Sequence, residues 1–64
     1  MKNRLREIRE EKGISQEELS EKSGVSRTTI SELETEKKEV TTNITLEKIA
    51  NALGEKVSNI FFIN

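Results

Sequence analysis

The chain contains no cysteine, histidine, proline, tryptophan or tyrosine. The absence of cysteine excludes disulfides, and without thiolate or imidazole side chains the chain lacks the usual zinc ligands and the usual nucleophile and base of hydrolytic enzymes. Its 12 acidic residues are all glutamates, in polar runs such as 10–12. Such runs are typical of solvated helix surface rather than of paired catalytic carboxylates. We therefore expect no enzyme activity, no metal ion and no cofactor.

Long apolar segments are missing as well. The longest unbroken apolar run is residues 60–63, far short of the roughly 20 residues that a membrane span needs, and no apolar leader follows Met1. This pattern predicts a soluble, cytoplasmic protein without a membrane partner. With 64 residues, close to the lower limit of about 50 for natural domains, the chain is expected to form a single domain over residues 1–64.

Apolar spacing and three separated glycines predict an all-α chain. Leucine and isoleucine recur at helical intervals, and Gly13, Gly24 and Gly54 stand where left-handed residues end helices. Residues 35–43 have no sustained apolar period and are expected to form an extended loop. The expected helices are about 1–12, 16–23, 27–34 and a helix that contains 46–53, followed by a short last turn that Ser58 caps.

Polar residues at the predicted helix starts support these boundaries. Ser15 and Glu18 have the spacing of a capping box, in which each side chain bonds the backbone amide of the other residue. Ser26 is a natural N-cap for the helix over 27–34, and either Thr42 or Thr45 caps the next one.

Residues 16–34 have the pattern of a helix-turn-helix, with two short helices joined at Gly24. The apolar residues at fitting positions are Leu19, Val25, Ile30 and Leu33. The segments LREIREEKGISQEELSEKSGVSRTTISELE and ITLEKIANALGEKVSNIF resemble the Cro and phage-repressor (Xre) type of helix-turn-helix regulator, over nearly the whole chain. The resemblance implies a compact five-helix, lambda-repressor-like fold. It also implies a transcriptional regulator, most often a repressor in this family, that binds double-stranded DNA.

The resemblance assigns one set of residues to base edges in the major groove, and these are Ser26, Arg27, Thr28 and Glu32. An arginine such as Arg27 can pair bidentately with guanine, and the methyl group of Thr28 can contact that of thymine. Glu32 can accept a hydrogen bond from a cytosine amino group, although its charge also repels phosphates.

A second set is assigned to the DNA backbone, and these residues are Gln16, Thr29, Thr35, Lys37 and Lys38. In similar proteins the glutamine at this helix start clamps a phosphate, and basic residues after the recognition helix contact phosphates. The alternative for Lys37 and Lys38 is a solvated pair of loop charges.

Arg9 and Glu34 match a pair that forms a partly buried salt bridge in the family, although two solvated surface charges would be the ordinary interpretation. Glu36 departs from the family pattern, because glycine is common at this position. If the turn needs a positive φ here, a glutamate side chain will be strained.

The C-terminal apolar residues predict a homodimer. One short recognition helix makes few base contacts, and regulators of this type read two half-sites of a palindromic operator, roughly 34 Å apart. Consecutive apolar residues cannot all face one core, so we expect Ile60, Phe62 and Ile63 at the dimer interface. The alternative is a disordered tail.

A different function remains open at this point. A sequence pI near 5.5 and the acidic Glu32 are compatible with a protein-interaction module that keeps the fold without binding DNA specifically, as in an antitoxin or a phage accessory factor. Salt-dependent binding to duplex DNA would distinguish the two functions.

Overall fold

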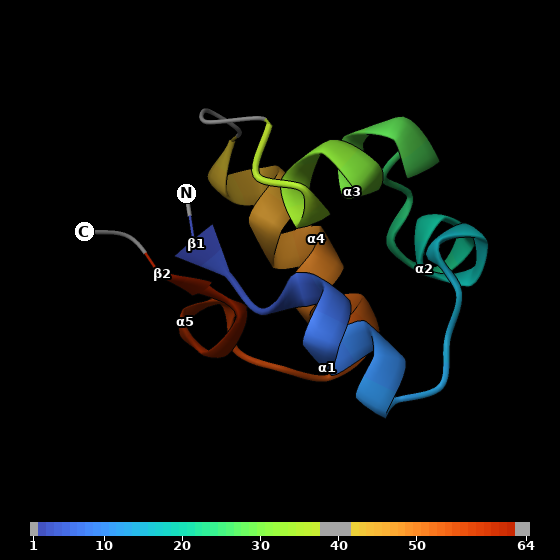
Figure 1. The fold of residues 1–64 in the computed structure, drawn as a ribbon, viewed down its shortest axis with the longest axis horizontal. Helices are drawn as coiled ribbons and strands as arrows, with labels where there is room; N and C mark the ends of the chain where they lie inside the picture. Colours follow the sequence, from blue (N-terminus) through green and yellow to red (C-terminus); the bar gives the residue numbers. More distant parts are fainter. Residues whose placement is uncertain (1, 38–41, 63–64) are drawn as a thin grey trace.

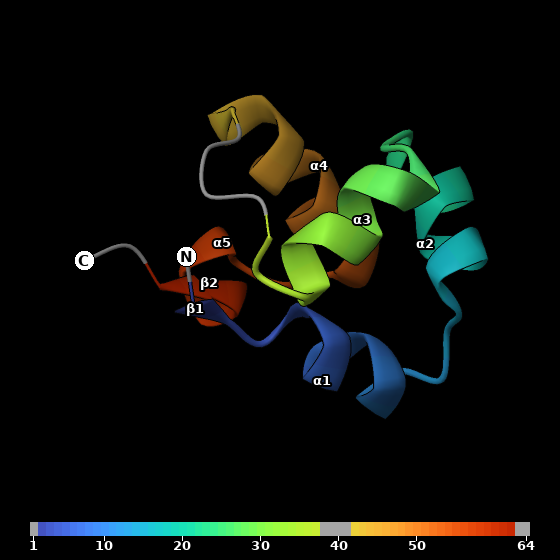
Figure 2. The same ribbon diagram turned by 45° about the horizontal axis from the view of Figure 1, so that its top comes forward.

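The computed structural model describes residues 2–37 and 42–62, and this part of the chain forms five helices and a ribbon of two short strands. The helices surround one core, and the ribbon lies at one end of the long axis, away from α2 (Figure 1, Figure 2). The predicted all-α, five-helix fold is confirmed. Two residues with predicted roles, Lys38 as a phosphate contact and Ile63 at the dimer interface, lie outside the described residues. In chain order the elements are β1 (Lys2–Asn3), α1 (Leu5–Glu11), α2 (Gln16–Ser23), α3 (Arg27–Glu34), α4 (Asn43–Leu53), α5 (Val57–Ile60) and β2 (Phe61–Phe62).

Side-chain caps begin three of the helices. The Ser15 hydroxyl accepts from the Glu18 amide at 3.0 Å, and the Glu18 carboxylate accepts from the Ser15 amide at 3.3 Å, so the predicted capping box starts α2. The Ser26 hydroxyl caps α3 by accepting from the amide three residues later at 3.2 Å. Of the two candidates for α4, Thr42 is the cap and accepts from the Thr45 amide at 3.2 Å. These contacts satisfy amides that have no partner within the helix.

Both ends of the described chain depart from the prediction. The helix expected over 1–12 starts only with α1, because β1 pairs antiparallel with β2 and the Arg4 amide donates to the Ile60 carbonyl at 2.8 Å. Backbone groups engaged in this ribbon cannot form an earlier helical turn. Ser58 is not a cap, because the helical backbone of α5 already begins at Val57 and no side chain caps it.

The hydrophobic core contains apolar residues from every helix. Ile60 is 0% exposed within it, so its predicted place at a dimer interface is wrong: a fully buried side chain offers no surface to a partner. Successive strand residues point to opposite faces, and accordingly Phe61 is buried whereas Phe62 is 43% exposed. The core residues are Leu5, Ile8, Leu19, Val25, Ile30, Leu33, Leu46, Ile49, Ala50, Leu53, Ile60 and Phe61.

The turn after α3 contains the strained residue anticipated from the sequence. The glycines that follow α1, α2 and α4 have φ between 68° and 75°, but in the described chain the corresponding residue after α3 is Glu36, with φ 59°. Two hydrogen bonds close this turn: the Glu36 amide donates to the Leu33 carbonyl at 3.2 Å, and the Lys37 amide to the Glu32 carbonyl at 2.9 Å. This is the bonding of a Schellman motif, which usually employs glycine.

Candidate nucleic-acid interface

Helix α3 has one apolar and one polar face. Ile30 and Leu33 are buried against the core, at 0% and 1% exposure. Because a helix repeats every 3.6 residues, the opposite face carries residues at intervals of one, three and four. Those residues are Arg27, Thr28, Ser31 and Glu32, followed by Thr35 at the helix end.

This polar face forms part of a shallow depression of about 380 Å³. The depression unites residues from three places in the chain: the start of α2, the polar face of α3 and the turn after it. Six of the predicted contact residues line it, together with Ser31, which the sequence reasoning missed. Ser31 lies four residues after Arg27 and four before Thr35, and this spacing was the signal that could have identified it. The lining residues are Gln16, Arg27, Thr28, Ser31, Glu32, Thr35 and Lys37.

The charges of this depression favour an anionic ligand. Its lining carries two cations, Arg27 and Lys37, against one carboxylate, Glu32. Both cations are exposed, and neither forms an ion pair with another residue in the described part of the chain. Their charges are therefore available to phosphate or to a guanine edge.

A hydrogen-bonded network holds Gln16 at the edge of the depression. The Gln16 amide nitrogen donates to Glu34 Oε1 at 3.1 Å. Arg9 donates to the same carboxylate from Nε at 2.7 Å and from Nη2 at 3.2 Å, and to the Ile14 carbonyl from Nη1 at 2.8 Å. The side chains of Arg9 and Glu34 are only 11% and 3% exposed. The hydrogen bond from Arg9 to Glu34 raises the pKa of Arg9, against the opposing effect of burial.

Several predicted contact hydroxyls are already engaged inside the protein. The Ser26 hydroxyl donates to Thr29 Oγ1 at 2.9 Å as well as capping α3, so its hydrogen does not face a base in this arrangement. The Thr35 hydroxyl donates to the Ser31 carbonyl at 2.9 Å, so it would need another rotamer to donate to a phosphate. Thr29 acts as an acceptor in its contact with Ser26, which leaves its own hydroxyl hydrogen for an outside acceptor.

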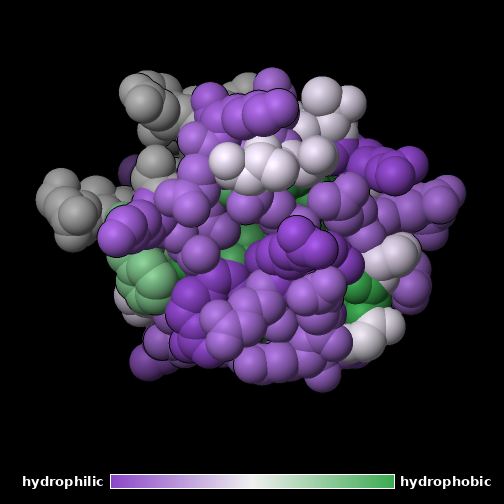
Figure 3. Space-filling model, viewed as in Figure 1, coloured by the Kyte–Doolittle hydropathy of each residue, from purple (hydrophilic) through white to green (hydrophobic). Residues whose placement is uncertain are grey.

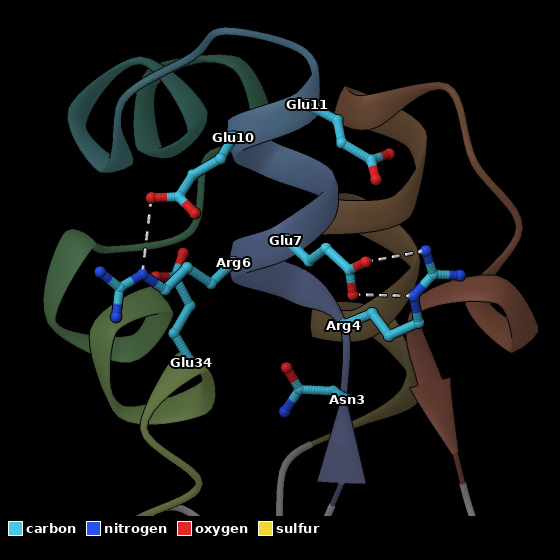
Figure 4. A pocket seen from close by; sticks show the side chains of 7 residues that line it. All are labelled: Asn3, Arg4, Arg6, Glu7, Glu10, Glu11 and Glu34. Atoms are coloured by element: carbon cyan, nitrogen blue, oxygen red, sulfur yellow. Dashed lines mark hydrogen bonds and ion pairs between the residues drawn. The ribbon is translucent and has the colours of Figure 1, made fainter.

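A larger depression of about 590 Å³ lies along α1, and acidic residues predominate in its lining. Figure 4 shows that its charged side chains pair among themselves: Arg4 with Glu7 at 3.1 Å and Arg6 with Glu10 at 3.6 Å. The hydrogen bond that Arg4 donates to the Glu7 carboxylate raises the pKa of Arg4. Glutamates outnumber arginines in the lining, so this face does not suit phosphate. The lining residues are Asn3, Arg4, Arg6, Glu7, Glu10, Glu11 and Glu34.

On the face seen in Figure 1, hydrophilic residues cover most of the surface, and the pale green area at the left lies over β2 (Figure 3). Among residues 2–37 and 42–62 there is no group of three acidic, histidine or cysteine side chains that could hold a metal ion. Nor does any helix in these ranges have the length and apolar character needed to cross a membrane.

Comparison with known proteins agrees with this geometry. A helix-turn-helix family model matches residues 5–60, which include all five helices of the described chain. A protein from Methanothermobacter thermautotrophicus, described as an uncharacterized HTH-type transcriptional regulator, is 42% identical over 66 residues. That similarity covers 100% of this chain and 93% of the relative.

Proposed function

Because the chain belongs to the Cro and phage-repressor (Xre) type of helix-turn-helix family, whose members are DNA-binding transcriptional regulators, we propose that it recognises a specific double-stranded DNA sequence and represses transcription. The observation that carries this proposal is the depression along α3, where residues from three places in the chain meet and two cations, Arg27 and Lys37, stand against one carboxylate, Glu32. An exposed helix with this polar face has the dimensions and chemistry to enter a major groove.

Sequence is read by the polar face of α3. Arg27 is exposed at the first turn of the helix and pairs with a guanine through its two parallel donors. Thr28 contacts a thymine methyl group. Glu32 lies one turn further along and accepts a hydrogen bond from a cytosine amino group. A duplex without cytosine at this position leaves the Glu32 carboxylate without that donor, which lowers the affinity.

The DNA backbone is held on both sides of this face. Gln16 has its amide nitrogen fixed toward Glu34, which leaves its second amide hydrogen to donate to a phosphate. Thr29 supplies a hydroxyl hydrogen, and Lys37 supplies a positive charge at the end of α3. Contacts of this kind set position and orientation without reading bases.

The protein acts as a homodimer on a palindromic operator, with half-sites roughly 34 Å apart. Phe62 supports this part of the proposal, because it is 43% exposed at the ribbon while its neighbour Phe61 is buried. Light scattering at micromolar concentration is expected to give the mass of a dimer. Phe62→Ser should give a monomer, whereas the matched control Ile44→Ser, at a 64% exposed apolar residue, should remain dimeric. A monomeric wild-type chain, or a dimeric Phe62→Ser variant, would remove this interface.

Selection of bound duplexes from random DNA, followed by salt titration of the selected duplex, tests the function itself. We expect a recurrent palindromic sequence and an affinity that falls steeply with salt, because each neutralised phosphate adds about −0.9 to the slope of log K against log salt. Glu32 and Glu36 favour one alternative, a protein-interaction module, since both place negative charge beside the proposed contacts. Recovery of no preferred sequence, together with salt-independent binding, would support that alternative.

A further inference from the structure

The side chain of Asn3 joins three separate elements of the fold. Its Oδ1 accepts from the Leu5 amide at 3.0 Å, at the start of α1. Its Nδ2 donates to the Leu33 carbonyl at 2.8 Å, near the end of α3 and 30 residues away in the chain. Figure 4 shows the side chain extending from β1 toward α3. The terminal ribbon is thereby bonded directly to the end of the proposed recognition helix.

The Leu33 carbonyl is also a closing acceptor of the strained turn. It receives the Glu36 amide at 3.2 Å, so Asn3 and Glu36 bond to the same oxygen. Glu36 has φ 59°, a conformation for which the turns after α1, α2 and α4 use glycine. A strained backbone of this kind persists only when surrounding structure supports it. Asn3 is such a support, and it comes from outside α3 and its turn.

Lys37 depends on the same turn. Its amide donates to the Glu32 carbonyl at 2.9 Å, and its side chain lines the depression along α3. If the turn at Glu36 relaxed to a negative φ, the backbone of Lys37 would leave this position and its side chain would change direction.

We propose that Asn3 is a positioning residue for DNA binding: by bonding to the Leu33 carbonyl it holds the turn that aims Lys37 at a phosphate. This role rests on the proposed function. It connects the ribbon of β1 and β2 to the DNA-contacting face, so the state of the ribbon influences affinity without any contact between the ribbon and DNA.

Salt titrations of duplex binding by the full chain test this role. Asn3→Ala and Asn3→Asp should each reduce the slope of log K against log salt by about 0.9, the contribution of one phosphate. Aspartate keeps the acceptor for the Leu5 amide but loses the donor to the Leu33 carbonyl, and it adds a charge. Alanine loses both hydrogen bonds but adds no charge. Equal effects of the two variants would therefore isolate the loss of the bond to Leu33. Asn51→Ala, at an exposed asparagine of α4, is the matched control and should leave the slope unchanged.

A double-mutant comparison identifies the route. Lys37→Ala alone should also reduce the slope by about 0.9, and adding Asn3→Ala to it should cause no further reduction. An unchanged slope in both Asn3 variants, or additive losses in the double variant, would overturn the role of Asn3. A wild-type chain without salt-dependent binding would refute the proposed function itself.

Amide hydrogen exchange in the free protein provides a readout that does not depend on DNA. Asn3→Ala should accelerate exchange at Glu36 and Lys37 at least tenfold more than at Gly24 and Gly54, whose amides close the turns after α2 and α4. Equal acceleration at all four amides would indicate general destabilisation and contradict the proposal.

Discussion

Breaking the Arg9–Glu34 salt bridge should strongly destabilise the fold. Glu34→Gln keeps the size of the side chain but removes its charge, and so leaves Arg9, whose side chain is 11% exposed, without its ion-pair partner. It also presents an amide nitrogen to a site where three donor nitrogens, two of Arg9 and one of Gln16, converge on the carboxylate. Arg9→Met is the complementary change and leaves Glu34, 3% exposed, with its charge uncompensated.

The expected cost is large for a chain of this length. Removing one partner of a buried ion pair costs about 3–5 kcal/mol, because the remaining charge is desolvated and unpaired. A 64-residue protein has a total free energy of unfolding of roughly 3–10 kcal/mol, at about 0.05–0.15 kcal/mol per residue. Each single variant should therefore lose a large share of its stability. The double variant removes both charges, so it should lose less than the sum of the two, by about 1–3 kcal/mol.

Urea unfolding of the wild type, the two single variants and the double variant measures these terms. Sucrose in all samples keeps weakly stable variants folded enough to give a transition. If the free energies of unfolding of the single variants lie within about 0.5 kcal/mol of the wild type, the pair contributes no more to stability than an exposed ion pair does. Additive losses in the double variant would show that the two side chains do not interact.

Three further changes test separate parts of the structure. Gln16→Ala should weaken binding to selected and scrambled duplexes by the same factor, because a phosphate contact does not read sequence; a loss confined to the selected duplex would contradict this role. Glu36→Gly should raise the free energy of unfolding by about 1 kcal/mol in thermal melts, since glycine adopts φ 59° without a Cβ penalty, and a lower melting temperature would argue against strain. Asn59→Ala should raise the pKa of the Glu55 carboxyl. The hydrogen bond from Asn59 is the largest cause that lowers this pKa, and the hydrogen bond from Lys12 is the next. Because this pKa is lowered in the folded state, its contribution to stability is present above the ordinary carboxyl range and is lost as pH falls through the folded-state value; NMR titration of Glu55 should show the shift, and an unchanged midpoint would contradict it.

The helices and most of their caps could be predicted because their signals are local. Ser15 and Glu18 satisfy each other across three residues, and the apolar stripe of α4 repeats within a few turns. The boundaries of α2 and α3 therefore agree with the sequence pattern.

The terminal ribbon could not be predicted because it depends on partners far apart in the chain. Lys2 pairs with Phe62 and Asn3 with Phe61, in strands of two residues that carry no periodic signal of their own. Ile60, which local reasoning assigned to a dimer interface, directly precedes this ribbon and is buried in the core.

The resemblance indicated which residues line the candidate site, but it did not indicate the hydrogen bonds among them. Residue types indicated which side chains lie along α3, but not that the Ser26 and Thr35 hydroxyls donate within the protein. Hydroxyl partners depend on rotamers and on exact helix ends, which a sequence pattern does not specify. Ser31 was missed because its helical spacing from Arg27 and Thr35 was not used to place it on the same face of α3.

The most direct test of the central claim, that α3 reads DNA sequence, is the ratio of affinities for the selected duplex and a scrambled duplex, measured for the wild type and Arg27→Ala at one salt concentration. Arg27 is exposed and is not one of the core residues, so the variant should melt within about 0.5 kcal/mol of the wild type. Loss of one bidentate arginine–guanine pair, worth about 1–3 kcal/mol, should reduce the ratio by about 5- to 150-fold. A ratio that stays the same in the folded variant would contradict recognition through this face of α3.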